Sequence, residues 1–188
     1  RHRGPNPLYW TYYHDDRSAG VSVHLADPRA DAGPILVQGR LDVPRGWPSG
    51  DLYLAAAALG AEVLPAAVES IARGTARPVP QTDAEATRAP RVEPGTAMID
   101  FASWDVERVW HYLAGLHAWY REPLITADGR RARYGAVLGF ERGRSEGETG
   151  RVRRSADGWA LCCRDGEVRL GRRSLVPTRV RSVSTSQA

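Results

Sequence analysis

Two carboxylates, Asp27 and Asp31, stand in a short turn between two apolar runs of the sequence. The first run alternates apolar and polar residues over 21–25, which predicts a half-buried strand, and the continuous run at 35–37 predicts a second one. A carboxylate at the end of a strand lies where open α/β sheets bind ligands and carry out chemistry. Taken by itself, the Asp31-Ala32-Gly33 spacing also fits a plain turn.

The segments around this turn resemble the second half of a folate-dependent formyltransferase domain. The resemblance is carried by RGPNPLYW at 3–10, AGVSVH at 19–24, DAGPIL at 31–36, and Gln38. The family includes methionyl-tRNA formyltransferases, sugar N-formyltransferases and glycinamide ribonucleotide transformylase. In it an Arg-Gly-x-x-Pro segment follows a catalytic Asn-x-His-x-Ser-x-Leu-Pro motif, and an Asp-x-Gly turn supplies the third catalytic residue.

This resemblance implies that Asp31 is the catalytic aspartate. It also implies that the loop of Asp27, Pro28, Arg29, Ala30 and Asp31 lines the pteridine pocket, mostly through backbone groups. The Asn and His of the motif are expected just upstream of Arg1, so we expect the chain to be truncated at its N-terminus. His2 and His24 are expected to be structural hydrogen bonders without a catalytic role.

The activity implied is transfer of a formyl group from 10-formyltetrahydrofolate to a primary amine, with no metal. Asn and His would stabilise the tetrahedral oxyanion and carry the proton between the two nitrogens, while the aspartate orients the His and favours its protonated form. A methionyl-tRNA acceptor is one hypothesis. The GPNP segment at 4–7 and Trp10 look closer to sugar or other small-amine N-formyltransferases. A third hypothesis is a non-catalytic fragment or a nucleic-acid-binding barrel module.

We expect an α/β protein: the C-terminal half of a Rossmann-like formyltransferase domain at 1–76, followed by an OB-like β-barrel domain at 96–176. The first part should end on an amphipathic helix at 49–73, capped by Ser49 and kinked or split by Pro65. By the resemblance, this is the helix that closes the formyltransferase domain, which is usually followed by a Gly and a Gln such as Gly74 and Gln81. Residues 77–95 change to Pro, Thr, Ala and charged residues, which predicts a linker. The polar tail at 177–188 is predicted to be disordered.

The second domain opens with Ile99-Asp100-Phe101, which resembles the Ile-Asp-Trp of the methionyl-tRNA formyltransferase type. Ser103 is expected to cap a helix, and its aromatic residues are expected to be core. Where the family often has an Arg in this helix, the chain has Ala114-Gly115. Turn signals then separate strand candidates at 134–140, 150–154, 159–163 and 167–170, a spacing typical of a small barrel.

Charge is unevenly distributed along the chain. All 26 basic residues are Arg; residues 1–127 hold 12 Arg against 15 acids, a balance of −3, and residues 128–188 hold 14 against 7, a balance of +7. A basic barrel offers phosphate contacts, so initiator methionyl-tRNA is a candidate partner, and a solvated arginine-rich surface is the alternative. The arginines concerned are at 130, 131, 133, 142, 144, 151, 153, 154, 172 and 173.

The two cysteines, Cys162 and Cys163, are adjacent, so on a strand they would point to opposite faces and form no mutual disulfide. This favours a reduced intracellular protein. The sequence contains no run of about eighteen apolar residues, so it predicts no membrane span. We therefore expect a cytoplasmic protein.

Overall fold

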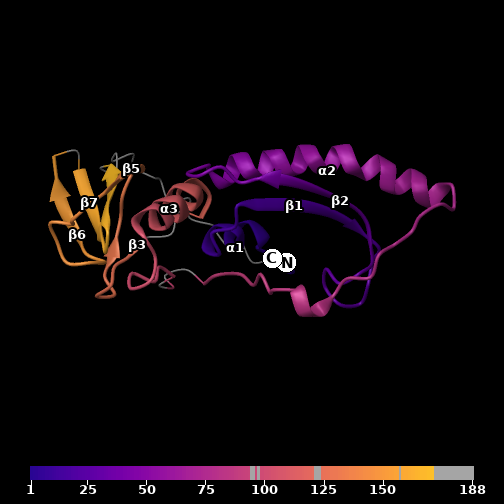
Figure 1. Ribbon diagram of the computed structural model, residues 1–188, viewed down its shortest axis with the longest axis horizontal. Helices are drawn as coiled ribbons and strands as arrows, with labels where there is room; N and C mark the ends of the chain where they lie inside the picture. The colour runs from indigo at the N-terminus through magenta and orange to yellow at the C-terminus, as the bar shows by residue number, and fades with distance from the viewer. Residues whose placement is uncertain (94–95, 97, 121–123, 157, 172–188) are drawn as a thin grey trace, which may run out of the picture.

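The computed structural model describes residues 1–93, 96, 98–120, 124–156 and 158–171. The predicted tail at 177–188, the end of the predicted second domain, Arg172 and Arg173 lie outside the described residues. The described part is elongated, with α3 between an N-terminal layer and a C-terminal sheet (Figure 1). Both parts are mixed helix and strand, so the α/β class is confirmed.

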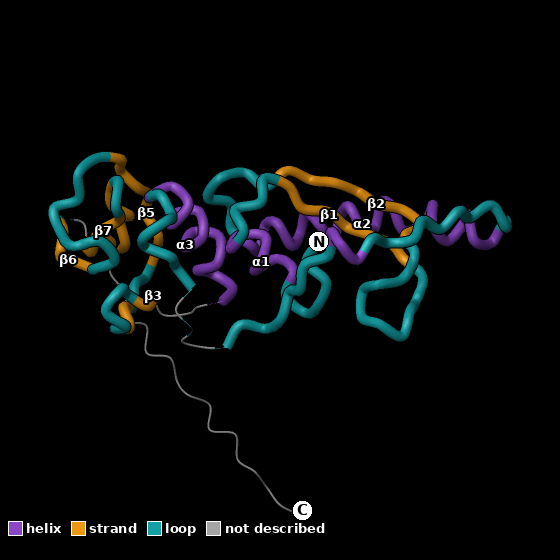
Figure 2. The backbone as a smooth tube through the Cα atoms, turned by 60° about the horizontal axis from the view of Figure 1, so that its bottom comes forward, coloured by secondary structure: helices purple, strands orange, loops and turns teal. Residues whose placement is uncertain are grey.

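The N-terminal layer begins with α1 (Pro7–Tyr13) and continues with an antiparallel hairpin, β1 (Ser18–His24) and β2 (Ile35–Asp42). The alternation predicted from sequence is present, because Val21 packs toward the long helix while Gly20 and Ser22 are exposed. The helix α2 (Ser49–Ala72) lies along the hairpin (Figures 1 and 2). The described strands pair only antiparallel, so a parallel Rossmann-like sheet is not present among them.

Two details of α2 differ from the sequence prediction. Ser49 is the first helical residue rather than the cap: the N-cap is Pro48, and Ser49 is buried with its hydroxyl unpartnered among the described residues. Pro65 lies inside one continuous helix and does not split it. It stands at an exposed position, where its missing N–H costs a hydrogen bond without breaking the packing against the hairpin.

The segment predicted as a linker runs back along the N-terminal layer (Figure 1). Val79 exchanges two backbone hydrogen bonds with Ile35, each 2.8 Å long. A short 3₁₀ turn, η1 (Asp83–Glu85), follows, and Arg3 then pairs with the backbone of 87–89. These contacts bring residues 79–89 against the turn that holds Asp31.

The helix α3 (Val106–Tyr120) joins the two layers. Asp105 accepts the N–H of Arg108, and Asp165 accepts the N–H of Val106, so these carboxylates cap the helix, whereas the Ser103 hydroxyl bonds Asp100. A Cβ on Gly115 would lie 2.2 Å from the Tyr12 ring. Only glycine therefore allows α1 and α3 to pack this closely.

The core is one cluster that extends from α1 through α3 to the C-terminal sheet. Trp104 and Tyr112 are buried in it, which confirms the predicted core role of these two aromatics. The side chains of Trp119 and Tyr120 lie outside the described residues.

The C-terminal strands form two small antiparallel sheets: the pair β3 (Leu124–Ile125) and β4 (Arg131–Ala132), and a four-stranded sheet in the order β5-β8-β7-β6. The larger sheet consists of β5 (Ala136–Arg142), β6 (Val152–Ser155), β7 (Gly158–Cys163) and β8 (Gly166–Gly171). All four predicted strands are confirmed. The prediction of a barrel is wrong for the described residues, because β5 and β6 are the two edges of an open sheet. No described strand closes this sheet, and α3 covers one of its faces.

Candidate functional site

The turn between β1 and β2 holds Asp31 in a left-handed backbone conformation, with φ of +53°. A Leu25 N–H to Pro34 C=O hydrogen bond of 3.0 Å closes the base of the loop. Gly33 is buried there, and a Cβ at its position would lie 1.8 Å from the Leu25 carbonyl oxygen. Only glycine at position 33 allows the backbone to lie this close to the Leu25 carbonyl, and this requirement explains the glycine of the Asp-x-Gly turn.

Two segments distant in sequence hold this turn. The Gly4 N–H donates to Oδ2 of Asp31 at 2.7 Å. The Gln81 side-chain amide donates to the carbonyl oxygens of Asp31 at 3.0 Å and Gly33 at 2.6 Å, and its Oε1 accepts from the Arg3 guanidinium at 3.0 Å. Arg3-Gly4, the Asp31 turn and Gln81 thus form one hydrogen-bonded unit.

Acidic groups around the turn are held ionised. The Arg3 guanidinium, which donates to Asp83, lowers the pKa of that carboxyl, and Arg29 adds to the effect. The backbone N–H of Arg29 lowers the pKa of Asp27 by donating to its carboxylate at 2.9 Å. Asp83 also bonds Arg29, at 3.2 Å, so it joins the loop to η1.

Asp31 lines a cleft of about 460 Å³ together with Gly4, Ser22, His24 and Gln38. Its side chain is 49% exposed, which leaves the carboxylate accessible from this cleft. His24 donates from Nδ1 to the Leu25 carbonyl at 2.8 Å, and its Nε2 lies 4.0 Å from Oδ1 of Asp31. Sequence reasoning missed this proximity, since the strand pattern shows only that His24 ends the strand.

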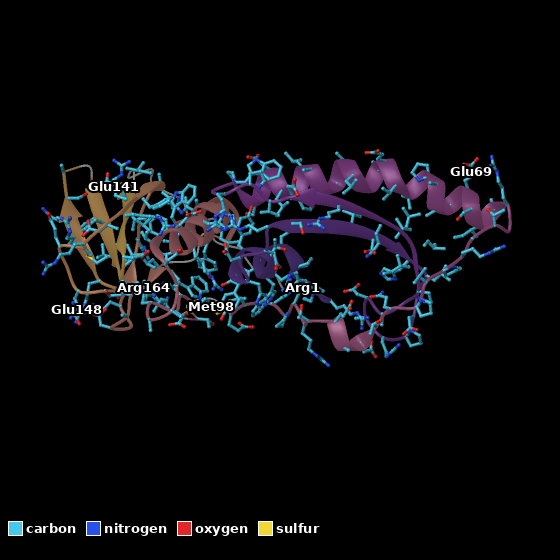
Figure 3. The ribbon with its side chains drawn as sticks, viewed as in Figure 1. Arg1, Glu69, Met98, Glu141, Glu148 and Arg164 are labelled. Carbon is cyan, nitrogen blue, oxygen red and sulfur yellow. The ribbon has the colours of Figure 1, made fainter. Side chains whose placement is uncertain are left out.

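The cleft continues along the edge of β1 that does not pair with β2. A second hollow of about 990 Å³ is lined by this edge, by α1 and by the start of α2. His2 stands at the mouth of both hollows, and its ring bonds Asp16 at 2.5 Å and Thr87 at 3.1 Å. Arg1, beside α1 in Figure 3, binds the same Asp16 at 2.8 Å.

The structure separates the predicted site residues. Asp31 lies in the cleft, whereas Asp27, Pro28, Arg29 and Ala30 form the outer part of the loop and do not line it. Within the described residues, the backbone N–H groups of Ala30 and Asp31 make no hydrogen bond. The loop therefore offers the unpaired backbone groups that a polar ring system needs, at the rim of the cleft rather than inside it.

A second, basic cleft of about 280 Å³ lies between the β3–β4 hairpin and the C-terminal sheet. Arg131 and Arg133 line it beside Tyr134 and Trp159, and neither arginine has an ion-pair partner among the described residues. Of the eight described arginines predicted to contact phosphates, four are in ion pairs: Arg130, Arg142, Arg151 and Arg153. Neighbouring carboxylates thus neutralise half of these eight arginines.

Comparison with known proteins gives a consistent family assignment. Residues 1–68 match the family model described as formyl transferase. The chain is 36% identical over 107 residues to methionyl-tRNA formyltransferase of Myxococcus xanthus, covering 57% of this chain and 34% of that protein. It is 28% identical over 171 residues to the Deinococcus radiodurans protein of that name, covering 89% of this chain and 51% of the relative. The chain thus spans between a third and a half of these relatives.

Solved structures share the fold over most of the chain. HypX from Aquifex aeolicus in complex with tetrahydrofolic acid matches with a TM-score of 0.63 and 22% identity, over 90% of this chain and 29% of that chain. The N-formyltransferase from Helicobacter canadensis in complex with folinic acid and dTDP-3-aminofucose matches with a TM-score of 0.67 and 14% identity, over 93% and 62%. At these identities the likeness establishes the fold.

Proposed function

The N-terminal part of this chain, residues 1–68, belongs to the formyl transferase family, and we propose that Asp31 serves in formyl transfer from 10-formyltetrahydrofolate to a primary amine. The observation that carries the proposal is the hydrogen bond from Gly4 to Asp31. It fixes an accessible carboxylate beside the segment where, by resemblance, the Asn-and-His motif enters. A carboxylate held at one oxygen leaves the other to orient an imidazole.

The open edge of β1 supports the same proposal. A strand edge with unpaired N–H and C=O groups is normally covered or paired, and this one borders the cleft that contains Asp31. We propose that a strand carrying the family Asn and His adds to this edge. Its imidazole would then meet Asp31, while the Asn amide would donate to the oxyanion.

The reaction makes one C–N bond and breaks another. The acceptor amine attacks the formyl carbon, a tetrahedral oxyanion develops, and the bond from that carbon to folate N10 breaks as the oxyanion collapses. The proton lost by the amine is returned to N10 by the imidazole. The Asp31 carboxylate stabilises the protonated imidazole between the two transfers.

Folate binding is part of the proposal. Solved relatives of this fold contain tetrahydrofolic acid or folinic acid. In this chain the loop of Asp27, Pro28, Arg29 and Ala30 is available at the rim of the cleft, and the backbone N–H groups of Ala30 and Asp31 make no hydrogen bond within the described residues. We propose that these backbone groups contact the pteridine ring and that Asp31 faces its formyl substituent.

For the acceptor we propose methionyl-tRNA, with an amino sugar as the second candidate. The basic cleft favours the first, because Arg131 and Arg133 lie beside two aromatic rings and are free to bind phosphates. The fold shared with an enzyme solved with dTDP-3-aminofucose favours the second. The two acceptors differ sharply in charge, so the salt dependence of acceptor binding distinguishes the two hypotheses.

The test is formyl transfer from 10-formyltetrahydrofolate, using the product of the reading frame extended upstream of Arg1, with charged initiator tRNA or a dTDP-amino sugar as acceptor. With tRNA, we expect the apparent affinity to fall steeply as salt rises, and Arg131→Gln with Arg133→Gln to reduce the slope. Arg144→Gln is the matched control, because Arg144 lies outside the cleft and forms no ion pair with the residues that the structure describes. An upstream sequence without Asn-x-His-x-Ser-x-Leu-Pro, or no transfer to any amine, overturns the proposal.

A further inference from the structure

The imidazole of His2 bridges two segments that are distant in the sequence. Its Nε2 bonds the carboxylate of Asp16, in the loop after α1, at 2.5 Å, and its Nδ1 lies 3.1 Å from the hydroxyl of Thr87. The ring of His14 stacks on it, with the centroids 5.4 Å apart, and the His2 side chain is only 11% exposed. Because both ring nitrogens have a partner, His2 is held in place although it stands at the mouth of two hollows.

The hydrogen bonds of this bridge fit a neutral imidazole. The Thr87 hydroxyl oxygen accepts the backbone N–H of His2 at 2.9 Å, and its own hydrogen is then available for Nδ1. This pattern places the ring hydrogen on Nε2, which donates it to Asp16. Arg1 bonds the other carboxylate oxygen of Asp16, at 2.8 Å. His2 therefore joins the loop after α1 to residue 87 through hydrogen bonds that are all satisfied.

The backbone turns sharply beside the bridge. His2 adopts a left-handed conformation, with φ of +58°, which is uncommon for residues other than glycine. Gly4 follows with φ of +129°, and a Cβ at its position would lie 2.8 Å from the Ala89 carbonyl oxygen. A left-handed conformation at a non-glycine residue persists only where its surroundings fix it. The side-chain bonds of His2 to Asp16 and Thr87 supply that constraint.

Arg3 lies between these two turns, and its backbone pairs with residues 87–89. Its N–H donates to the Thr87 carbonyl at 2.8 Å, and its own carbonyl accepts from the Ala89 N–H at 2.7 Å. The next N–H along the chain is that of Gly4, which donates to Oδ2 of Asp31 at 2.7 Å. A shift of residue 2 relative to residue 87 would therefore move the donor that holds Asp31.

We propose that His2 is a positioning residue for formyl transfer, an inference that rests on the proposed function of Asp31. Through the bridge, its imidazole holds the Gly4 N–H on the Asp31 carboxylate. His2 acts through Gly4 and not by contact with the reacting atoms. Loss of the bridge should slow the chemical step and leave folate binding nearly unchanged, because the backbone groups that we propose for the pteridine belong to the loop at 27–30.

The first test is amide hydrogen exchange of the 188-residue chain, followed by NMR at the Gly4 N–H. Thr87→Val keeps the size of the side chain and removes its hydroxyl, so we expect Gly4 to exchange at least about tenfold faster. The amide of Val79, which donates to the Ile35 carbonyl at 2.8 Å, should keep its exchange rate. His2→Leu, which removes the imidazole, should give the same result, and circular dichroism shows whether each variant is folded.

The second test is the rate of formyl transfer by the product of the reading frame extended upstream of Arg1. Thr87→Val should lower kcat about tenfold and change the KM for 10-formyltetrahydrofolate by less than about twofold. Thr87→Ser keeps the hydroxyl and should restore kcat. Thr75→Val should retain the wild-type kcat and is the matched control, because the Thr75 hydroxyl donates to the Ser70 carbonyl at 3.3 Å, outside the cleft of Asp31.

A double-mutant cycle separates the positioning of Asp31 from a general effect on the fold. In the Asp31→Ala background no carboxylate remains for Gly4 to hold, so adding Thr87→Val should lower the residual kcat no further. If the bridge only stabilised the fold, the two losses in kcat would multiply. Thr75→Val in the same background is the control for this cycle.

The proposal is overturned if Gly4 exchanges at the wild-type rate in both Thr87→Val and His2→Leu. It is also overturned if Thr87→Ser loses as much activity as Thr87→Val, or if the losses in the double-mutant cycle multiply. Failure of the proposed function gives a different result: the wild-type protein then transfers no formyl group, while the exchange of Gly4 still reports whether the bridge holds its N–H.

Discussion

The carboxylate of Asp31 accepts a hydrogen bond of 2.7 Å from the backbone N–H of Gly4, a residue 27 positions earlier in the chain. This contact uses Oδ2 and leaves Oδ1 facing the cleft, 4.0 Å from His24. Because the donor belongs to the backbone, it cannot rotate away as a side chain could. The carboxylate is therefore oriented before any ligand arrives, which reduces the cost of organising a reactive site.

Asp31→Asn should abolish most of the formyl-transfer activity while preserving the fold. The Asn side-chain oxygen can still accept from Gly4, but the negative charge that stabilises an imidazolium is lost. We expect turnover to fall at least about a hundredfold. The measurement is initial rate at saturating 10-formyltetrahydrofolate. Asp42→Asn, an exposed carboxylate at the end of β2 that does not line the cleft, is the matched control. Near-normal turnover in Asp31→Asn would remove Asp31 from the mechanism.

Gln81→Ala should loosen the turn that carries Asp31. The variant loses the two hydrogen bonds to the carbonyls of Asp31 and Gly33 and the two from the Arg3 guanidinium. We expect a loss of about 1–3 kcal/mol in the free energy of unfolding, together with reduced turnover. Urea denaturation measures the first. Gln38→Ala, which removes one exposed bond to Ser22, should cost less, and equal effects of the two variants would refute the clamp.

His24→Gln should alter turnover far less than Asp31→Asn does. Its ring bonds the Leu25 carbonyl, a structural contact, and lies 4.0 Å from Asp31, beyond hydrogen-bond distance. Glutamine keeps a donor at this position, so we expect turnover within about threefold of the wild type. A loss comparable with that of Asp31→Asn, together with a changed pH profile, would show that His24 is itself the imidazole that Asp31 orients.

The buried His111 should make the protein less stable as the pH falls. Burial, with help from Arg45, lowers the pKa of its fully buried ring from 6.5 to about 4. Its Nδ1 accepts from the Gly46 N–H at 2.9 Å, and its Nε2 has no hydrogen-bond partner among the described residues. The ring is therefore neutral in the folded state.

Below pH 6.5 the unfolded chain takes up a proton at this position that the folded chain binds only near pH 4. The free energy of unfolding therefore decreases as the pH falls from 6.5 to 4, by about 3 kcal/mol in total. Below pH 4 the contribution of His111 no longer changes. Urea denaturation across this range measures it. His111→Gln should flatten the plot of unfolding free energy against pH more than His14→Gln does. His14 is an exposed histidine whose pKa is also lowered, so it serves as the control. Identical plots for His111→Gln and the wild type would contradict the assignment.

Local periodicity placed most of the longer elements, but it did not indicate α1 or the short strands β3 and β4. The alternation at 21–25, the helix from 49 and the four C-terminal strands all follow from spacing of two or about 3.6 residues, and these are properties of neighbouring residues. The barrel could not be predicted in the same way. Whether β5 and β6 meet depends on twist and on what covers the sheet, and here α3 covers one face.

Helix capping also depends on residues that are distant in the sequence. Ser103 stands at a suitable position before α3, yet Asp165, 59 residues later, accepts the first helical N–H. Likewise, residues 77–95 have a linker composition, but Val79 pairs with Ile35, and Thr87 and Ala89 pair with Arg3. Such partners are decided by tertiary packing, which overrides a local preference worth only about 1 kcal/mol.

The sequence by itself determined most of the longer elements, the family resemblance and the choice of Asp31 as the candidate catalytic residue, because each depends on a short segment of the chain. Only the tertiary structure showed that Gly4 and Gln81 hold that residue, that His24 lies beside it, and that α2 presents a second apolar face to solvent. These relationships join residues 27 and 50 positions apart or depend on which face a helix buries. A one-dimensional pattern carries no information on such distances until the chain has packed.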